Sequence, residues 1–189
     1  MSPVRIIENP DHAVLTRCSR GHSRSQEHLY KKYYAYALSV TLRFIPNREE
    51  AREVVNDVFV KVFTRLKEDI PENFTGWLRR IAVHTAVDHY RANRTRRELL
   101  PDIGEILPVP VPDDILDHLN AEDILNLLGQ LNEIPRMVFI LYEIEGYNHE
   151  EIAGMLNLEI STSRSHLSRA KAFLRNSLLT ISRNERSAG

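Results

Sequence analysis

Residues 98–123 are the segment that most limits how this chain can fold. They hold Pro101, Pro108, Pro110 and Pro112, together with eight acidic residues and no lysine or arginine. Proline lacks a backbone N–H and favours extended backbone over packed helix, so this segment is expected to be a linker. The sequence therefore predicts two folded parts joined by an extended, acidic linker.

Apolar residues recur at helical spacing on both sides of this linker. Residues 48–66, for example, place three valines on one side and acidic side chains on the other. Glycine is scarce, with seven in 189 residues. We therefore predict an all-α fold of two small helical domains, 1–97 and 124–189. The expected helices lie at about 26–44, 48–66, 77–91, 121–131 and 135–145, and as a pair within 148–175.

The composition is that of an ordinary soluble protein, with 42% hydrophobic and 27% charged residues. Cys18 is the only cysteine, so an internal disulfide is impossible and a reducing cytoplasm is the expected location. No run of apolar residues reaches the length of about 18 that a membrane span needs, and the N-terminus has no secretory hydrophobic region. Membrane insertion is therefore not expected.

Charge is unevenly distributed although the net charge is only −1. Residues 76–97 hold six arginines and one aspartate, a local charge of +5. Residues 158–189 hold six basic and two acidic residues, a local charge of +4. Basic blocks on helices are typical of proteins that bind a phosphate backbone. A solvated helix face explains either block alone about equally well, but two blocks that each accompany a motif favour nucleic-acid binding.

Residues 148–175 carry the pattern of a helix-turn-helix. Asn148 and Glu151 have the spacing of a capping box, and Asn157 suits the left-handed residue of a tight turn. A second helix is expected to begin near Ile160 and to enter the major groove with its N-terminal end. An ordinary helical hairpin is the alternative for this segment. The side chains expected to point outward are Ser161, Thr162, Arg164, Ser165, His166 and Arg169.

The helix expected at 77–91 combines aromatic with basic side chains. Trp77 and Tyr90 belong to residue types that are more often core anchors than ligand platforms. Arg80, His84 and Arg91 lie roughly along one face of this helix. Cations beside aromatic rings suit unstacked, single-stranded bases better than intact duplex.

His84 and Asp88 lie one turn apart, with His89 adjacent, which raises the question of a metal site. A third ligand at a suitable spacing is missing, and catalytic metal sites use three protein ligands. The sequence also holds no nucleophile–base constellation. We therefore expect no enzyme, no catalytic residue, no metal, no cofactor and no small-molecule substrate.

Three stretches carry a family resemblance. "REEAREVVNDVFVKVFTRL" (48–66) is similar to region 2.1–2.2, and "FTGWLRRIAVHTAVDHYRANRTRR" (74–97) resembles regions 2.3–2.4, of the extracytoplasmic-function (ECF) subfamily of bacterial sigma-70-type RNA polymerase sigma factors. "LNEIPRMVFILYEIEGYNHEEIAGMLNLEISTSRSHLSRAKAFLR" (131–175) resembles region 4 of that subfamily. The likeness covers about residues 26–97 and 124–178, in the order that the family has.

The resemblance implies a sigma factor that directs promoter recognition and transcription initiation. Its partners would be the core enzyme of bacterial RNA polymerase, promoter DNA and an anti-sigma protein. Matching positions for binding core polymerase are Glu53, Asn56, Asp57 and Lys61. Those for the melted −10 element are Phe74, Trp77, Arg80, His84, Arg91 and Arg94. The helix from Ile160, with the outward side chains given above, would read the −35 element.

Four positions depart from the family's pattern. His84 stands where asparagine is usual, Glu159 replaces a usual serine, Ser163 a usual valine, and His166 a common arginine. The alternative function is a homodimeric helix-turn-helix repressor or activator, which would account for 148–175 but not for the basic block at 76–97.

Overall fold

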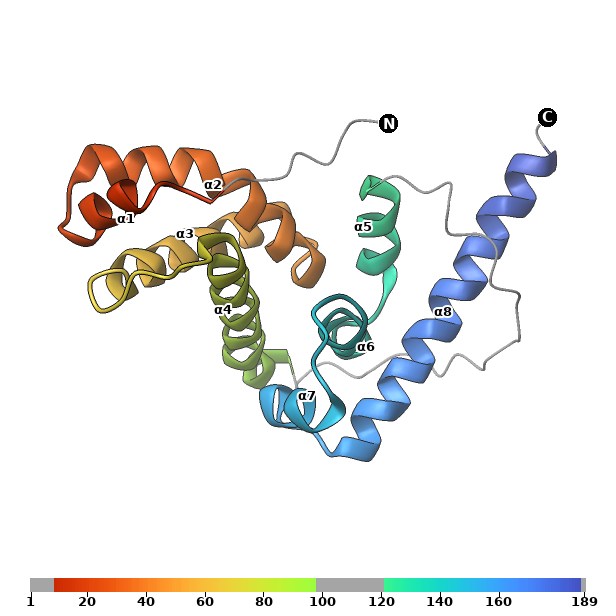
Figure 1. Cartoon of the computed structure of the whole chain (residues 1–189). Helices are drawn as coiled ribbons and strands as arrows, with labels where there is room; N and C mark the ends of the chain where they lie inside the picture. Colours follow the sequence, from red (N-terminus) through yellow and green to blue (C-terminus); the bar gives the residue numbers. More distant parts are fainter. Residues whose placement is uncertain (1–8, 98–120, 188–189) are drawn as a thin grey trace. The chain divides into compact units, whose positions relative to one another are not determined.

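The computed structural model describes residues 9–97 and 121–187, with side chains for 9–93 and 123–179. All regular structure in these ranges is helical, which confirms the predicted all-α class (Figure 1). The chain divides into two compact units, the first ending at Tyr90 and the second beginning at Arg91. Nearly all of the predicted linker lies at 98–120, outside the described residues.

Four helices begin within the described part of the first unit: α1 (His12–Ser19), α2 (Ser23–Phe44), α3 (Arg48–Arg65) and α4 (Phe74–Arg97). Helix α1 was not expected from the sequence. It is eight residues long, and helices of this length are not stable alone. Leu15 and Cys18 of α1 are buried, so packing rather than local propensity holds this helix in place.

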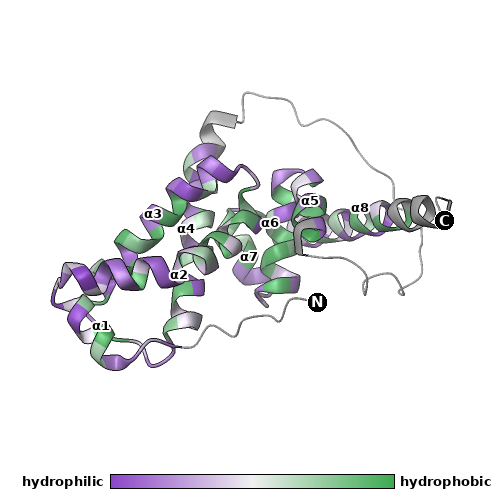
Figure 2. Ribbon diagram, turned by 90° about the horizontal axis from the view of Figure 1, so that it is seen from above, coloured by the Kyte–Doolittle hydropathy of each residue, from purple (hydrophilic) through white to green (hydrophobic). Residues whose placement is uncertain are grey.

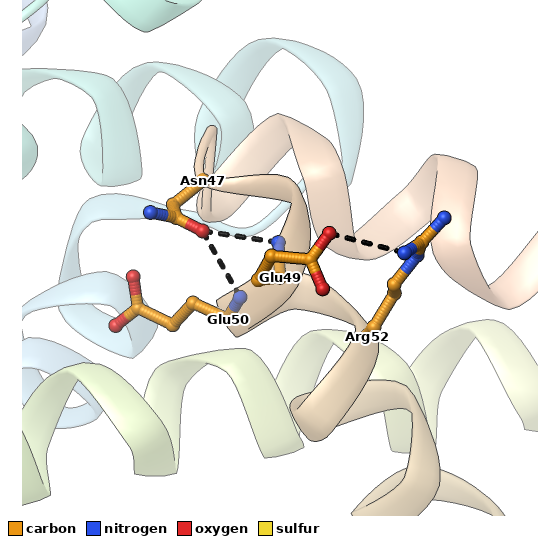
Figure 3. Close-up of polar contacts among 4 residues, drawn as sticks. All are labelled: Asn47, Glu49, Glu50 and Arg52. Atoms are coloured by element: carbon orange, nitrogen blue, oxygen red, sulfur yellow. Dashed lines mark hydrogen bonds and ion pairs between the residues drawn. The ribbon is translucent and has the colours of Figure 1, made fainter.

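Side chains at the helix ends explain where α3 begins. Asn47 caps α3, because its side-chain oxygen accepts hydrogen bonds from the backbone N–H groups of Glu49 at 3.0 Å and Glu50 at 3.1 Å (Figure 3). The two glutamates in the first turn also stabilise the helix through its dipole. The Glu49 carboxylate additionally binds Arg52 at 3.0 Å.

The core of the first unit lies between α2, α3 and α4, whose residues alternate between hydrophilic and hydrophobic along each helix (Figure 2). Burying one large apolar side chain contributes about 1.5–3 kcal/mol. Two polar contacts add to this packing by joining α3 to α4: Lys61 to Asp88 at 2.8 Å, and Glu50 to His89 at 2.7 Å. The most deeply buried large side chains here are Leu29, Tyr33, Phe44, Leu66, Phe74, Leu78 and Ile81.

The second unit contains α5 (Ala121–Gln130), α6 (Glu133–Phe139), the π-helical turn η2 (Ile140–Ile144), α7 (His149–Leu156) and α8 (Ile160–Ser187). The helix expected at 135–145 is thus present as α6 and η2, with Pro135 in the first turn of α6, where a proline is tolerated. Arg136 is buried, and its Nη1 donates a hydrogen bond to the Leu131 carbonyl at 2.9 Å, which ties α6 to the end of α5.

Candidate nucleic-acid interface

Helices α7 and α8 form the tight helical pair that the sequence predicts. Asn148 and Glu151 make a reciprocal capping box: the Asn148 side chain accepts from the Glu151 backbone N–H at 3.0 Å, and the Glu151 carboxylate accepts from the Asn148 N–H at 2.8 Å. Asn157 ends α7 in the left-handed conformation, with φ 53° and ψ 56°. Helix α8 then begins at Ile160. The predicted cap, turn residue and start of the second helix are all confirmed.

The first three turns of α8 have a buried side and an exposed side. Ser163, Leu167 and Ala170 are buried on the side that faces the rest of the unit. Most of the side chains expected to point outward are exposed, namely Ser161, Arg164, Ser165 and Arg169, whereas Thr162 and His166 are half-buried. Arginine and small hydroxyl side chains on one exposed helix side can reach base edges and phosphates in a major groove.

Ser163 is held by a residue that the sequence did not single out. Its hydroxyl lies 3.0 Å from Nδ1 of His149, in the first turn of α7. The His149 ring stacks on Tyr142 of η2, with ring centroids 4.6 Å apart. Burial, and to a smaller extent the charges of Arg164 and Lys171, lower the pKa of His149 below its ordinary value of 6.5. Only the departure at Ser163 hinted at this contact in the sequence.

Helix α4 presents a stripe of mixed character. Arg80, His84, Asp88 and Arg91 are exposed and follow one another at three- or four-residue spacing, and the half-buried Trp77 begins the stripe. Asp88 is bound to Lys61 of α3, which offsets the one negative charge in this stripe. The arrangement combines an aromatic ring with fixed cations on one helix side, a combination that is common in proteins that bind single-stranded nucleic acid.

Phe74 differs from the expectation that it contacts DNA. Its side chain is 0% exposed, with its ring centroid 4.9 Å from that of Tyr33 and 5.8 Å from that of Trp77. Phe74 is therefore a core residue in this structure and supports Trp77 from the inside. Tyr90 is also buried. Arg94 lies in α4, but its side chain is outside the described residues.

Helix α3 presents a second exposed stripe. Glu53, Asn56 and Asp57 are exposed on it. Lys61 is less available than expected, because its ammonium group binds Asp88. Two features of this surface were not predicted: Val60, an apolar side chain that is 64% exposed, and the hydroxyl of Tyr30, which donates to the Asn56 side-chain oxygen at 3.0 Å.

His84, Asp88 and His89 do not converge on a metal site. Across the part of the chain that the structure describes, no group of three or more histidine, cysteine, aspartate or glutamate side chains could hold a metal ion. His89 instead contacts Glu50 of α3. Within the same described ranges, no helix has the length and apolar content needed to cross a membrane.

Comparison with known protein families matches both units. The family model for Sigma-70 region 2 matches residues 29–96, and that for Sigma-70 region 4 matches residues 121–174. The ECF RNA polymerase sigma factor SigE of Mycolicibacterium smegmatis is 29% identical over 158 residues, which cover 82% of this chain and 62% of the relative. The chain belongs to the ECF sigma factors.

Two further sigma factors are matched over more of their own length. The RNA polymerase sigma-H factor of Pseudomonas aeruginosa is 27% identical over 179 residues, covering 88% of this chain and 92% of the relative. The chain is also similar to a chain in the solved structure of the sigma factor RpoE in complex with the anti-sigma factor NepR from Bartonella quintana. The two chains are 18% identical in sequence, and the match covers 82% of this chain and 96% of the other, with a TM-score of 0.48.

Membership of the sigma factors decides between the two functions that the sequence left open. A homodimeric helix-turn-helix repressor would need only residues 148–175, but the region 2 match at 29–96 gives the first unit a role as well. The repressor alternative is therefore not favoured, and the chain is an RNA polymerase sigma factor for promoter recognition.

Proposed function

We propose that this sigma factor binds core RNA polymerase through α3 and contacts promoter DNA through α4 and α8. The observation that carries the proposal is the presence, in one chain, of an aromatic and cationic stripe on α4 and a helix-turn-helix in the second unit. Each feature alone suits several nucleic-acid-binding proteins. Together with the matches to regions 2 and 4, they support two separate DNA contacts.

The proposed polymerase-binding surface is the exposed side of α3 around Glu53, Asn56 and Asp57. The opposite side of α3 is buried in the first unit, so the exposed side is available to a partner. Val60 adds an exposed apolar side chain beside these polar groups, and protein interfaces commonly combine apolar and polar side chains. Tyr30 orients Asn56 through the hydrogen bond between the hydroxyl and the amide oxygen.

The proposed −10 contact is the α4 stripe of Trp77, Arg80, His84 and Arg91. Stacking of one base on an aromatic ring contributes about 1–3 kcal/mol, and Trp77 is half-exposed above the buried ring of Phe74. The arginines would bind the phosphates of the same strand. His84 stands next to these groups and is proposed to contact a base of the melted strand.

The proposed −35 contact is the exposed side of α8 from Ser161 to Arg169. Between α4 and α5 lie residues 98–120, a segment slightly shorter than the 98–123 expected from the sequence, because α5 begins at Ala121. These residues can span about 75–83 Å when fully extended. Promoter elements two helical turns apart lie roughly 70 Å from each other, so one chain can contact both.

An anti-sigma protein is proposed as a further partner, by analogy with the family. The expected place of action is the cytoplasm, and no catalytic role, metal or cofactor is proposed for the chain.

Run-off transcription tests the proposed function directly. Purified core polymerase is supplied with genomic fragments, with and without the full chain, and transcripts are mapped. We expect defined start sites only when the chain is present, and DNA binding that requires core polymerase. Tight, sequence-specific binding to duplex by the chain alone, with no new transcripts when core polymerase is added, would contradict the proposal.

A further inference from the structure

The packing of α7 against α8 includes a polar contact where sigma factors of this type are expected to have an apolar side chain. Ser163 is 0% exposed, and its hydroxyl lies 3.0 Å from Nδ1 of His149. A buried hydroxyl that loses its partner is unfavourable, because water cannot replace the lost hydrogen bond. Ser163 therefore depends on His149 for its place in the structure.

His149 is in turn held by a third element. Its ring stacks on Tyr142 at a centroid distance of 4.6 Å and an interplanar angle of 26°. Tyr142 lies in η2, where the backbone departs from α-helical to π-helical winding, a feature that often occurs at functional sites. His149 thus connects η2, α7 and α8 through one ring.

Burial and two nearby cations favour the neutral form of His149. Helix α8 contributes Arg164 and Lys171, and η2 contributes Tyr142 and Glu143, whose carboxylate binds Lys171 at 2.6 Å. Burial, with the smaller effect of these two cations, lowers the pKa of His149 below 6.5. In the neutral form, Nδ1 can accept a hydrogen bond from the Ser163 hydroxyl when the other ring nitrogen carries the proton.

We propose that His149 and Ser163 are positioning residues for −35 recognition, fixing the first turns of α8 against α7 while the imidazole is neutral. This inference rests on the proposed role of α8. Ser163 lies within two residues of Ser161, Arg164 and Ser165, all of which are exposed on the side proposed to meet DNA. The hydrogen bond at Ser163 therefore sets the rotation of α8 from which these side chains extend.

The His149–Ser163 pair should affect sequence-specific DNA binding more than binding to DNA of any sequence. Contacts to base edges need accurate placement, whereas contacts to phosphates carry no sequence information. Protonation of His149 places a third positive charge beside Arg164 and Lys171 and removes the acceptor at Nδ1. Sequence-specific binding should therefore weaken as the pH falls, while an added positive charge on its own would strengthen binding to any DNA sequence.

The test measures the ratio of two affinities for the full chain in complex with core polymerase. The complex first selects its preferred sequence from a library of randomised duplexes, and this duplex is the first probe. The second probe is the same duplex with the segment bound by α8 scrambled. We expect Ser163→Ala and His149→Phe each to lower the ratio about tenfold. Because the two residues act as one unit, the double variant should lose no more than either single variant.

A pH series separates positioning from a merely structural role. His149→Phe keeps a ring to stack on Tyr142 but has no titrating group, so its ratio should be constant between about pH 7.5 and 5.5. The ratio of the unchanged chain should fall over that range. His149→Asn supplies an amide oxygen as acceptor and should recover part of the ratio, again without pH dependence.

Several results would overturn the inference. One is an affinity ratio that is unchanged in both single variants, and another is a loss in the double variant that equals the sum of the two single losses. A third is a pH dependence of the ratio in His149→Phe that equals that of the unchanged chain. If the selection returns no sequence at all, the proposed function fails instead, and amide hydrogen exchange then tests the pair on its own. Exchange at residues 163–167 should be faster in Ser163→Ala than in the unchanged chain at equal helix content, and equal exchange would exclude the positioning role.

Discussion

Phe74 and Trp77 are neighbouring aromatic residues with different surroundings. Phe74 is enclosed by Tyr33 and the rest of the first unit, whereas Trp77 remains half-exposed at the start of the α4 stripe. The difference follows from helical spacing, because residues three apart on a helix point in similar but not identical directions. One ring contributes to stability and the other is available to a ligand.

Substitution of the two rings should therefore have separable effects. Phe74→Ala should destabilise the first unit by about 3–5 kcal/mol, because it leaves a cavity in the core. Trp77→Ala should change the melting temperature little but weaken binding of a template with an unpaired −10 segment by about 1–3 kcal/mol, measured with core polymerase present. Equal losses of stability in the two variants would identify Trp77 as a core anchor instead.

Arg164 and Arg91 allow a comparison of base and phosphate contacts. If Arg164 reads a base edge, Arg164→Ala should cost about 1–3 kcal/mol, concentrated at one base pair of the −35 element. Arg91→Ala should weaken binding to all sequences alike and lower the slope of log affinity against log salt by about one. Titrations against single-base promoter variants at several salt concentrations distinguish the two. Sequence-blind losses from both changes would rule out base readout by Arg164.

At the scale of elements, the sequence was sufficient to predict where helices begin and end, but not which side chains of different helices contact each other. The Asn47 cap, the Asn148–Glu151 box and the left-handed Asn157 depend on residues within a few positions of each other, so they could be predicted. The pairing of Lys61 with Asp88 depends on two helices meeting, as does the contact of His149 with Ser163. The spacing of residues in a single sequence does not predict such contacts between helices.

Helix α3 has one side for the core and another for a partner, and a charge reversal tests this division. Asp57→Arg should weaken association with core polymerase, since it reverses a charge at the centre of the proposed surface. Exposed substitutions of this kind usually change stability by less than about 0.5 kcal/mol, so circular dichroism and the melting temperature should be nearly unaltered. Glu68→Arg, the same reversal at an exposed position beyond α3, is the control and should bind normally. A loss of helicity in Asp57→Arg that matches its loss of binding would make Asp57 a structural residue.

At the scale of the whole molecule, the two units are proposed to act on separate promoter elements. The segment between them is then required for its length more than for its composition. Its acidic residues suit either solubility or a path along a basic surface of a partner. Length and composition can be varied independently, which makes the proposal testable.

Deleting residues 103–110 should leave a segment that spans only about 50–54 Å, less than the roughly 70 Å between promoter elements two turns apart. Run-off transcription from a promoter that needs both elements should fall more than tenfold. Replacing the same eight residues with glycine and serine should preserve most of the transcription. If the deletion were as active as the replacement, simultaneous contact with both elements by one chain would be excluded.

The reactivity of the Cys18 thiol can report how fast α1 detaches from the first unit. Cys18 is the only cysteine of the chain and is fully buried in α1, and burial raises the pKa of its thiol, so the reactive thiolate is scarce while the unit is closed. A thiol reagent should therefore modify the chain only as fast as α1 detaches. Modification kinetics with and without core polymerase would measure how much the partner slows that local unfolding, with no label engineered into the chain.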